Sequence, residues 1–203
     1  LIAPIENFLD GKKMITIIPS EQLYYIPIHA LARQSSTGTI EFLIERFNVN
    51  YLSSIGFLNL VKARNRSQSP NRQEHIVALA NADGTLPKSE DEVRSVQLFL
   101  PDAEIYIGKN ATEEIAVQKS RDCSTLILST HCNLNNQNPN QTFVQLASSG
   151  SYDGRWHVSE VQEISCPNLN LVILSACQTA IGQENPGLEV CTFAESFSAA
   201  GSV

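Results

Sequence analysis

Short runs of aliphatic and β-branched residues alternate along the chain with segments whose apolar residues recur at helical spacing. Several of these runs are apolar throughout, as in strands that helices cover on both faces. The alternation predicts an α/β protein with a mostly parallel sheet. The predicted strands are Met14–Ile18, Asn48–Leu52, His75–Ala80, Glu104–Ile107, Thr125–Ser129 and Leu171–Leu174.

Helices are predicted between these strands from their start signals and their apolar faces. Ser89–Glu92 has the pattern of a capping box, ahead of a helix that continues to Leu100. Thr112, followed by two glutamates, is expected to cap a second helix. Val158–Ile164 and Gly187–Ala200 are predicted as further helices, and the second of these is amphipathic.

Two polar stretches interrupt the pattern. Residues 64–74, which include Pro70, predict a flexible linker between an N-terminal portion, 1–63, and a main core, 75–203. Residues 132–142 are crowded with Asn and Gln and are expected to form a loop. Asp83-Gly84 reads as a turn.

Composition narrows the classes of function. The net charge is −7 and the pI is near 5.1, whereas nucleic-acid binders concentrate Lys and Arg on one face, so we expect no directly bound nucleic acid. No apolar run approaches the roughly 20 residues that cross a bilayer, and no signal peptide precedes the first strand, so we expect a cytoplasmic protein without a membrane partner.

The cysteines point to free thiols. There are five of them, an odd number without paired spacing, which suits a reducing cytosol better than a disulfide framework. No Cys-x-x-Cys occurs, and no Gly-rich phosphate loop, so neither a metal site nor a cofactor is expected.

Two predicted strands end beside residues that can do chemistry. The first strand, Thr125–Ser129, is followed by Thr130 and then by His131-Cys132. The second, Leu171–Leu174, is followed by Ser175-Ala176-Cys177. Because parallel strands end at one edge of a sheet, neighbouring positions for these strands would bring an imidazole and a thiol together. A histidine can activate a thiol for attack on a carbonyl, and backbone N–H groups at such a turn can bind the oxyanion.

A plain packing role is the alternative for each of these residue types, because Cys is among the most buried of all residues. We expect His29 and His75 to be structural and His157 to lie on a surface loop. For Cys123, Cys166 and Cys191, packing is the expected role.

The ordered motifs resemble the CHAT family, caspase-like cysteine peptidase domains commonly found after tetratricopeptide repeats. The Leu-Ser-Ala-Cys-Gln-Thr block at 174–179 is the specific match, and the likeness runs from Ile15 to Val203. The other matching segments are 15–19, 23–31, 42–47, 49–51, 53–54, Leu86-Pro87, Glu92-Val93, Gly108, Ala111-Thr112, 129–131, Gly182 and 199–201.

The resemblance implies a caspase-like three-layer α/β/α sandwich, with the C-terminal part of the domain missing from this chain. It also implies a His131–Cys177 dyad that hydrolyses peptide bonds through an acyl-enzyme, with an oxyanion hole from the backbone N–H groups of Cys132 and Cys177. The family normally has Gly directly after the histidine. Cys132 stands in that place, and a positive φ there would strain the oxyanion hole.

Three functions follow as hypotheses. The first is a cysteine endopeptidase acting on a protein or peptide substrate, controlled by attached tetratricopeptide repeats or by a regulatory protein partner. The second is a caspase-fold interaction module whose dyad is silent or conditional, motivated by Cys132. A receiver-like or nucleotide-binding module is the third, and the missing phosphate loop disfavours it.

Overall fold

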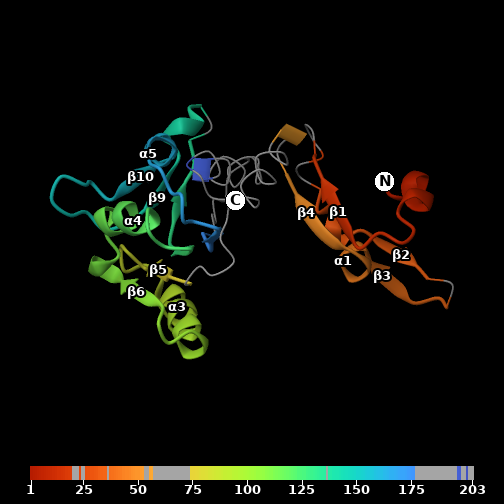
Figure 1. The fold of residues 1–203 in the computed structure, drawn as a ribbon, viewed down its shortest axis with the longest axis horizontal. Coiled ribbons are helices and arrows are strands. Elements are labelled where there is room, and N and C mark those ends of the chain that lie inside the picture. Colours follow the sequence, from red (N-terminus) through yellow and green to blue (C-terminus); the bar gives the residue numbers. More distant parts are fainter. Residues whose placement is uncertain are drawn as a thin grey trace. The chain divides into compact units, whose positions relative to one another are not determined.

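The computed structural model describes residues 1–19, 23, 26–35, 37–52, 55–56, 74–135, 137–176, 196–197 and 200. The chain divides into two compact units, Leu1–Ser67 and Gln68–Val203, which Figure 1 draws as ribbons. The boundary falls inside the segment 64–74. Most of that segment lies outside the described residues, so the flexible linker stays a prediction.

The first unit pairs two short sheets with a small core. β1 and β4 are parallel, and β2 and β3 form an antiparallel pair. Ile28, Leu43 and Phe47 are the buried centre of its hydrophobic cluster. Its elements are η1 (Ala3–Phe8), β1 (Met14–Ile17), η3 (Ile28–Ala30), β2 (Ala32–Gln34), β3 (Ile40–Phe42), α1 (Leu43–Arg46) and β4 (Asn48–Tyr51).

The second unit is built on a four-stranded sheet with the order β11-β7-β5-β6, in which every neighbouring pair is parallel. The prediction of an α/β fold with a mostly parallel central sheet is therefore confirmed. The strands are β5 (Ile76–Ala80), β6 (Glu104–Ile107), β7 (Thr125–Ser129) and β11 (Leu171–Leu174). The last three have the predicted bounds, because each is an uninterrupted run of strand-forming residues.

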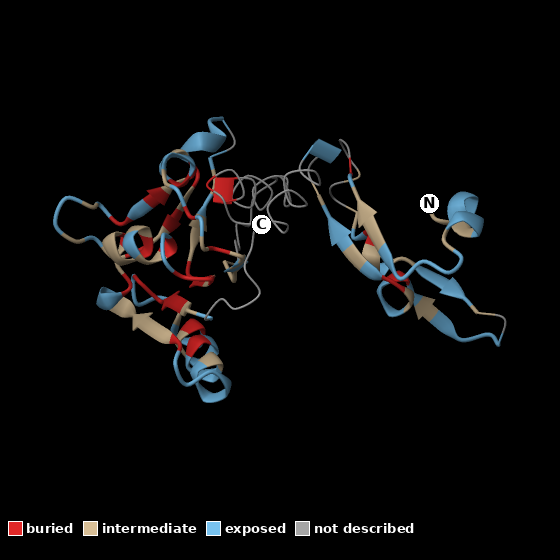
Figure 2. Ribbon diagram, in the orientation of Figure 1, coloured by how far each residue is buried: buried red, intermediate tan, exposed pale blue. Residues whose placement is uncertain are grey.

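Helices cover this sheet on both faces, which gives three layers (Figure 1). On one face, Ala78 and Ala80 of β5 pack with Val93 of α3. On the other face, Val77 and Leu79 join a larger cluster that includes residues of the remaining helices. These helices are α3 (Pro87–Phe99), α4 (Glu113–Ser120) and α5 (Val158–Glu163), with short 3-10 turns η4 (Gly108–Asn110) and η5 (Pro139–Gln141). Figure 2 shows the buried residues concentrated where helices and sheet meet.

One predicted helix start is right and one is wrong. The Thr112 side chain accepts a hydrogen bond from the Ile115 N–H at 3.2 Å and caps α4 as predicted. α3 begins at Pro87 and not after a cap at Ser89. Proline suits the first turn because its fixed φ is helical and that turn's N–H groups have no partner within the helix, and the Ser89 hydroxyl donates instead to the Leu86 carbonyl at 2.8 Å.

Three very short strands form an antiparallel sheet that the sequence pattern did not predict. The strands are β8 (Cys132–Asn133), β9 (Phe143–Gln145) and β10 (Arg155–His157), in the order β10-β9-β8. The stretch 132–142 is therefore not all loop, and His157 ends a strand and does not lie on a loop. Among the predicted helices, Gly187–Ala200 lies largely outside the described residues. No described helix has both the length and the apolar character to cross a bilayer.

Candidate active site

The strand order of the second unit reverses between β5 and β7. From β5 the chain crosses over α3 to β6 on one side, and α4 then returns it to β7 on the other side of β5. Open α/β sheets bind ligands outside the carboxyl ends of the strands at such a reversal. The residues at this point are the loop 81–86 after β5 and His131 after β7.

His131 is held by the loop after β5. Its Nε2 lies 2.8 Å from Thr85 Oγ1 and 3.9 Å from Asp83 Oδ2, and its side chain is 35% exposed. The next residue, Cys132, packs with the hydrophobic cluster on the α4 and α5 side of the sheet. Successive residues of the extended chain thus turn to different surroundings, as expected, and the imidazole is left accessible at the sheet edge.

Asp83 and Thr85 are functional candidates that the sequence pattern missed. The motif Asp83-Gly84 reads as a turn, and Gly84 does have a φ of +79°. Asp83 Oδ1 also accepts hydrogen bonds from the Thr85 N–H at 3.0 Å and the Thr85 hydroxyl at 2.7 Å. Partial burial raises the pKa of Asp83, but these two hydrogen bonds and nearby His131 outweigh it, so the pKa ends below its ordinary value.

Asn81 fixes the shape of this loop. It is 4% exposed, and its φ of +49° makes it the one non-glycine residue with positive φ in the part of the chain that the structure describes. Its Oδ1 accepts the Leu86 N–H at 2.7 Å, and its Nδ2 donates to Glu90 Oε1 at 2.6 Å. Asn tolerates the left-handed conformation better than most residues, so the side chain that permits the turn also ties it to α3.

The strands that precede the two predicted dyad residues are direct neighbours. β7 and β11 pair in parallel, with Leu128 opposite Leu174, and the Ser175 N–H continues the ladder by donating to the Leu128 carbonyl at 2.9 Å. The side-by-side, same-direction arrangement on which the dyad prediction depends is confirmed. Cys177 itself lies outside the described residues.

A single carboxylate joins the ends of these strands. Glu92 Oε2, on α3, accepts hydrogen bonds from the Ser129 hydroxyl at 2.6 Å and from the Ser175 hydroxyl at 3.0 Å. Ser129 is 1% exposed, so its hydroxyl depends on a protein acceptor. Glu92 therefore ties the carboxyl ends of β7 and β11 to the helix that covers them.

The backbone at Cys132 carries none of the strain considered for this position. Cys132 begins β8, opposite Val144, and does not have a positive φ. The Gln145 N–H donates to the His131 carbonyl at 2.8 Å, which makes Cys132 and Val144 a non-hydrogen-bonded pair of the antiparallel ladder. The Cys132 N–H accordingly points away from β9.

The other histidines have structural partners, as expected for His29 and His75. His29 Nδ1 lies 2.8 Å from the Tyr51 hydroxyl, and His75 Nε2 lies 2.8 Å from Glu104 Oε1. His157 Nδ1 lies 3.2 Å from the Gln141 carbonyl. Cys123 and Cys166 are both fully buried, in keeping with packing, and Cys191 lies outside the described residues.

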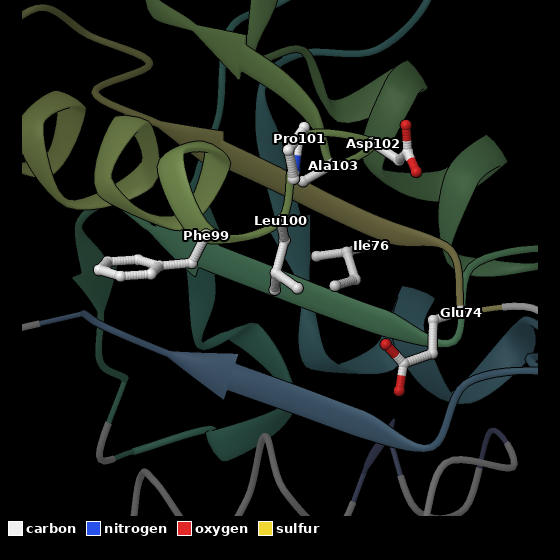
Figure 3. Close-up of a pocket in the computed structure, with 7 residues that line it drawn as sticks. All are labelled: Glu74, Ile76, Phe99, Leu100, Pro101, Asp102 and Ala103. Carbon is white, nitrogen blue, oxygen red and sulfur yellow. The ribbon is translucent and has the colours of Figure 1, made fainter.

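A shallow pocket of about 150 Å³ lies at the opposite end of the sheet. Figure 3 shows its Leu100 and Ile76 side chains next to each other, with the carboxylates of Asp102 and Glu74 above and below on the Ile76 side. Ile76 is the first residue of β5, whereas His131 comes two residues after Ser129, the last residue of parallel β7. The pocket is therefore separate from the candidate active site.

The comparison with protein families gives one match over the whole chain. The CHAT domain profile matches residues 1–203. No curated protein sequence matches the chain.

Proposed function

Because the chain belongs to the CHAT domain family, which is related to caspase-like cysteine peptidases, we propose that it is a cysteine endopeptidase with His131 as base and Cys177 as nucleophile. The substrate class is a protein or peptide, since the reaction assigned to this dyad is hydrolysis of a peptide bond. Control by tetratricopeptide repeats or another regulatory protein belongs to the same proposal, through the family resemblance.

The observation that carries the proposal is the register of β7 and β11. Each β11 residue pairs with the β7 residue 46 positions earlier (171 − 125, 174 − 128). Cys177 comes 46 positions after His131 in the sequence (177 − 131). In the sequence, His131 and Cys177 therefore each come three positions after a member of the Leu128–Leu174 pair, which supports assigning both to one site.

The chemistry follows from these two groups. The imidazole accepts the thiol proton, and the thiolate attacks the scissile carbonyl carbon to give a tetrahedral oxyanion. The C–N bond then breaks, the amine leaves with the proton from His131, and a thioester remains on Cys177. Water, losing a proton to His131, hydrolyses the thioester, and the proton returns to the thiolate as the acid product leaves.

The oxyanion needs hydrogen-bond donors, for which we propose the backbone N–H groups of Cys132 and Cys177. The direction of the Cys132 N–H, away from β9, supports this role. A strand residue other than glycine adopts such a backbone without strain, which removes the main ground for regarding the dyad as silent.

The test is proteolysis of a peptide library by the chain, compared with Cys177→Ala and His131→Ala variants and followed by mass spectrometry. We expect cleavage by the wild type and a loss of at least about a hundredfold in each variant, within the usual contribution of such groups. The matched control is Cys166→Ala, at a buried cysteine away from the sheet edge, which retains cleavage when folded. Unchanged cleavage by Cys177→Ala would refute the proposal.

Thiol labelling gives a second, substrate-free test. Burial, together with the neighbouring Cys166, raises the pKa of Cys123 to about 12, so Cys123 stays a thiol and resists iodoacetamide at neutral pH. A Cys177 paired with His131 is expected to react fastest of all the cysteines below pH 7. Labelling of Cys177 at the rate of an ordinary exposed thiol, unaffected by His131→Ala, would contradict the dyad.

A further inference from the structure

We infer that Thr85 and Asp83 form a positioning pair for His131, which holds the ring with its proton on Nε2 and leaves Nδ1 to accept the proton of the Cys177 thiol. The inference rests on the proposed dyad and adds the residues that prepare its base. It is carried by three contacts among residues that come from two different loops of the sheet edge.

A count of protons fixes the direction of each hydrogen bond. Thr85 Oγ1 lies 2.7 Å from Asp83 Oδ1 and 2.8 Å from His131 Nε2. A hydroxyl has one proton to give, and an ionised carboxylate can only accept. The Thr85 proton is therefore directed at Asp83, and the Thr85 oxygen accepts a hydrogen bond from His131 Nε2–H.

The tautomer of His131 follows from this direction. A neutral imidazole carries one proton, and with that proton on Nε2 the lone pair is on Nδ1. A base needs that lone pair on the nitrogen that faces the nucleophile. Since Nε2 is turned to Thr85 and Asp83, Nδ1 is the nitrogen available to Cys177.

Asp83 has a second effect once the proton has moved. Its Oδ2 lies 3.9 Å from His131 Nε2, within the range at which an opposite charge favours the protonated imidazole. The carboxylate is thus placed to attract the imidazolium of a thiolate–imidazolium pair.

The loop is rigid enough to act in this way. Asp83 Oδ1 is fixed by the Thr85 N–H as well as by the hydroxyl, and Asn81 ties the loop to Leu86 and to Glu90 of α3. The contacts between Asp83 and Thr85 would be enough to stabilise a turn that had only a structural role. The additional contact from Thr85 to His131, a residue on another strand end, is what a positioning role requires.

The experiment uses the chain labelled with ¹⁵N-histidine. The protein has four histidines, and the His131 ring signals are identified by their loss in His131→Gln. We expect Nε2 to carry the proton of the neutral ring in the wild type. Valine has nearly the same shape as threonine but no hydroxyl, so in Thr85→Val we expect a larger fraction of neutral His131 to carry its proton on Nδ1. Thr85→Ser keeps the hydroxyl and is expected to keep the wild-type tautomer.

Iodoacetamide labelling of Cys177 against pH provides the second readout. Thr85→Val and Asp83→Asn are expected to slow labelling at pH 6 by on the order of tenfold to a hundredfold, the effect of a misplaced catalytic group. In both variants, the pH at which labelling rises is expected to move up toward about 8.5, the pKa of an ordinary thiol. Thr112→Val is the matched control, because it removes the cap of α4 and leaves both readouts of the folded protein unchanged.

The outcomes separate the two proposals. The positioning pair is refuted if the wild-type ring carries its proton on Nδ1. It is also refuted if neither Thr85→Val nor Asp83→Asn changes the tautomer or the labelling rate. In both cases, labelling of Cys177 that depends on His131 would still support the dyad. Should Cys177 react as an ordinary thiol in the wild type and in His131→Ala alike, the dyad itself fails. If Thr85→Val does not fold, the wild-type tautomer and Asp83→Asn still decide the matter.

Discussion

Ser129 and Ser175 donate hydrogen bonds from their hydroxyls to the same oxygen of Glu92, at 2.6 and 3.0 Å. Ser129 is the last residue of β7, and Ser175 directly follows β11. The acceptor belongs to α3, so one helix residue joins two neighbouring strands at the edge where the proposed dyad lies. Each serine stands two positions before a dyad residue, Ser129 before His131 and Ser175 before Cys177.

Glu92→Ala is expected to lower the free energy of unfolding by about 1 kcal/mol or somewhat more, because two hydrogen bonds are lost and the buried Ser129 hydroxyl is left without that acceptor. Urea unfolding followed by circular dichroism measures the change. The matched control is Asp91→Ala on the same helix, where an exposed pair with Lys88 is worth no more than about 0.5 kcal/mol. Equal effects of the two substitutions would show that Glu92 does not join the strand ends.

Glu104 makes stability depend on pH in the acid range. Its carboxylate lies 2.5 Å from Lys119 Nζ and accepts a hydrogen bond from the Tyr106 hydroxyl at 2.7 Å. The hydrogen bonds from Lys119, Tyr106 and His75 outweigh burial and lower the pKa of Glu104 from 4.5 to about 2. A lowered carboxyl pKa means that the folded state holds its proton less tightly than the unfolded state does.

The contribution of Glu104 is therefore fully present above pH 4.5 and is lost as the pH falls from 4.5 toward 2. Glu104→Gln is expected to reduce stability at pH 7 and to lose less of it on acidification. Denaturant unfolding at pH 7, 4.5 and 3 measures both effects, with Glu163→Gln, at an exposed position of α5, as the control. If the wild-type and Glu104→Gln stabilities fall in parallel below pH 4.5, the ion cluster has no such role.

Gly154 is required by the close approach of two backbone segments. A Cβ on Gly154 would lie 2.5 Å from the Leu146 carbonyl oxygen, and its φ is +88°. Gly150, in the same connection between β9 and β10, has a φ of +56° but open space around it. Alanine at 150 is expected to cost about 1 kcal/mol for the left-handed backbone, and alanine at 154 about 2–4 kcal/mol because a clash is added.

Thermal or urea unfolding of the two alanine variants measures this difference. The Gly154 N–H also donates to buried Glu113 at 2.8 Å, so a shift of the backbone there disturbs the start of α4. Equal losses at the two positions would mean that the chain relaxes around the new methyl group without strain.

The parallel sheet could be predicted from the sequence because its strands are continuous apolar runs. Thr125–Ser129 and Leu171–Leu174 have the predicted bounds, and the prediction that both lead to one edge needs only their common direction. The capping pattern at Ser89 predicts the wrong start for α3. A proline two residues earlier gives a competing signal, and it marks the true first turn.

The antiparallel strands could not be predicted, for a different reason. β10 contains only Arg155, Trp156 and His157, and β8 only two residues, which is too short for a period of two to appear. These strands are defined by their pairing with β9 and not by their own composition. The contact between Thr85 and His131 was likewise out of reach, since it joins loops that follow two different strands.

The distance from Cys177 Sγ to His131 Nδ1 in a crystal structure of the chain tests the central claim most directly. We expect a separation of about 3–4 Å, close to hydrogen-bond reach for sulfur, with Nε2 still turned to Thr85. A sulfur farther than about 6 Å from the ring, or one buried on the same side of the sheet as the Cys132 side chain, would contradict it.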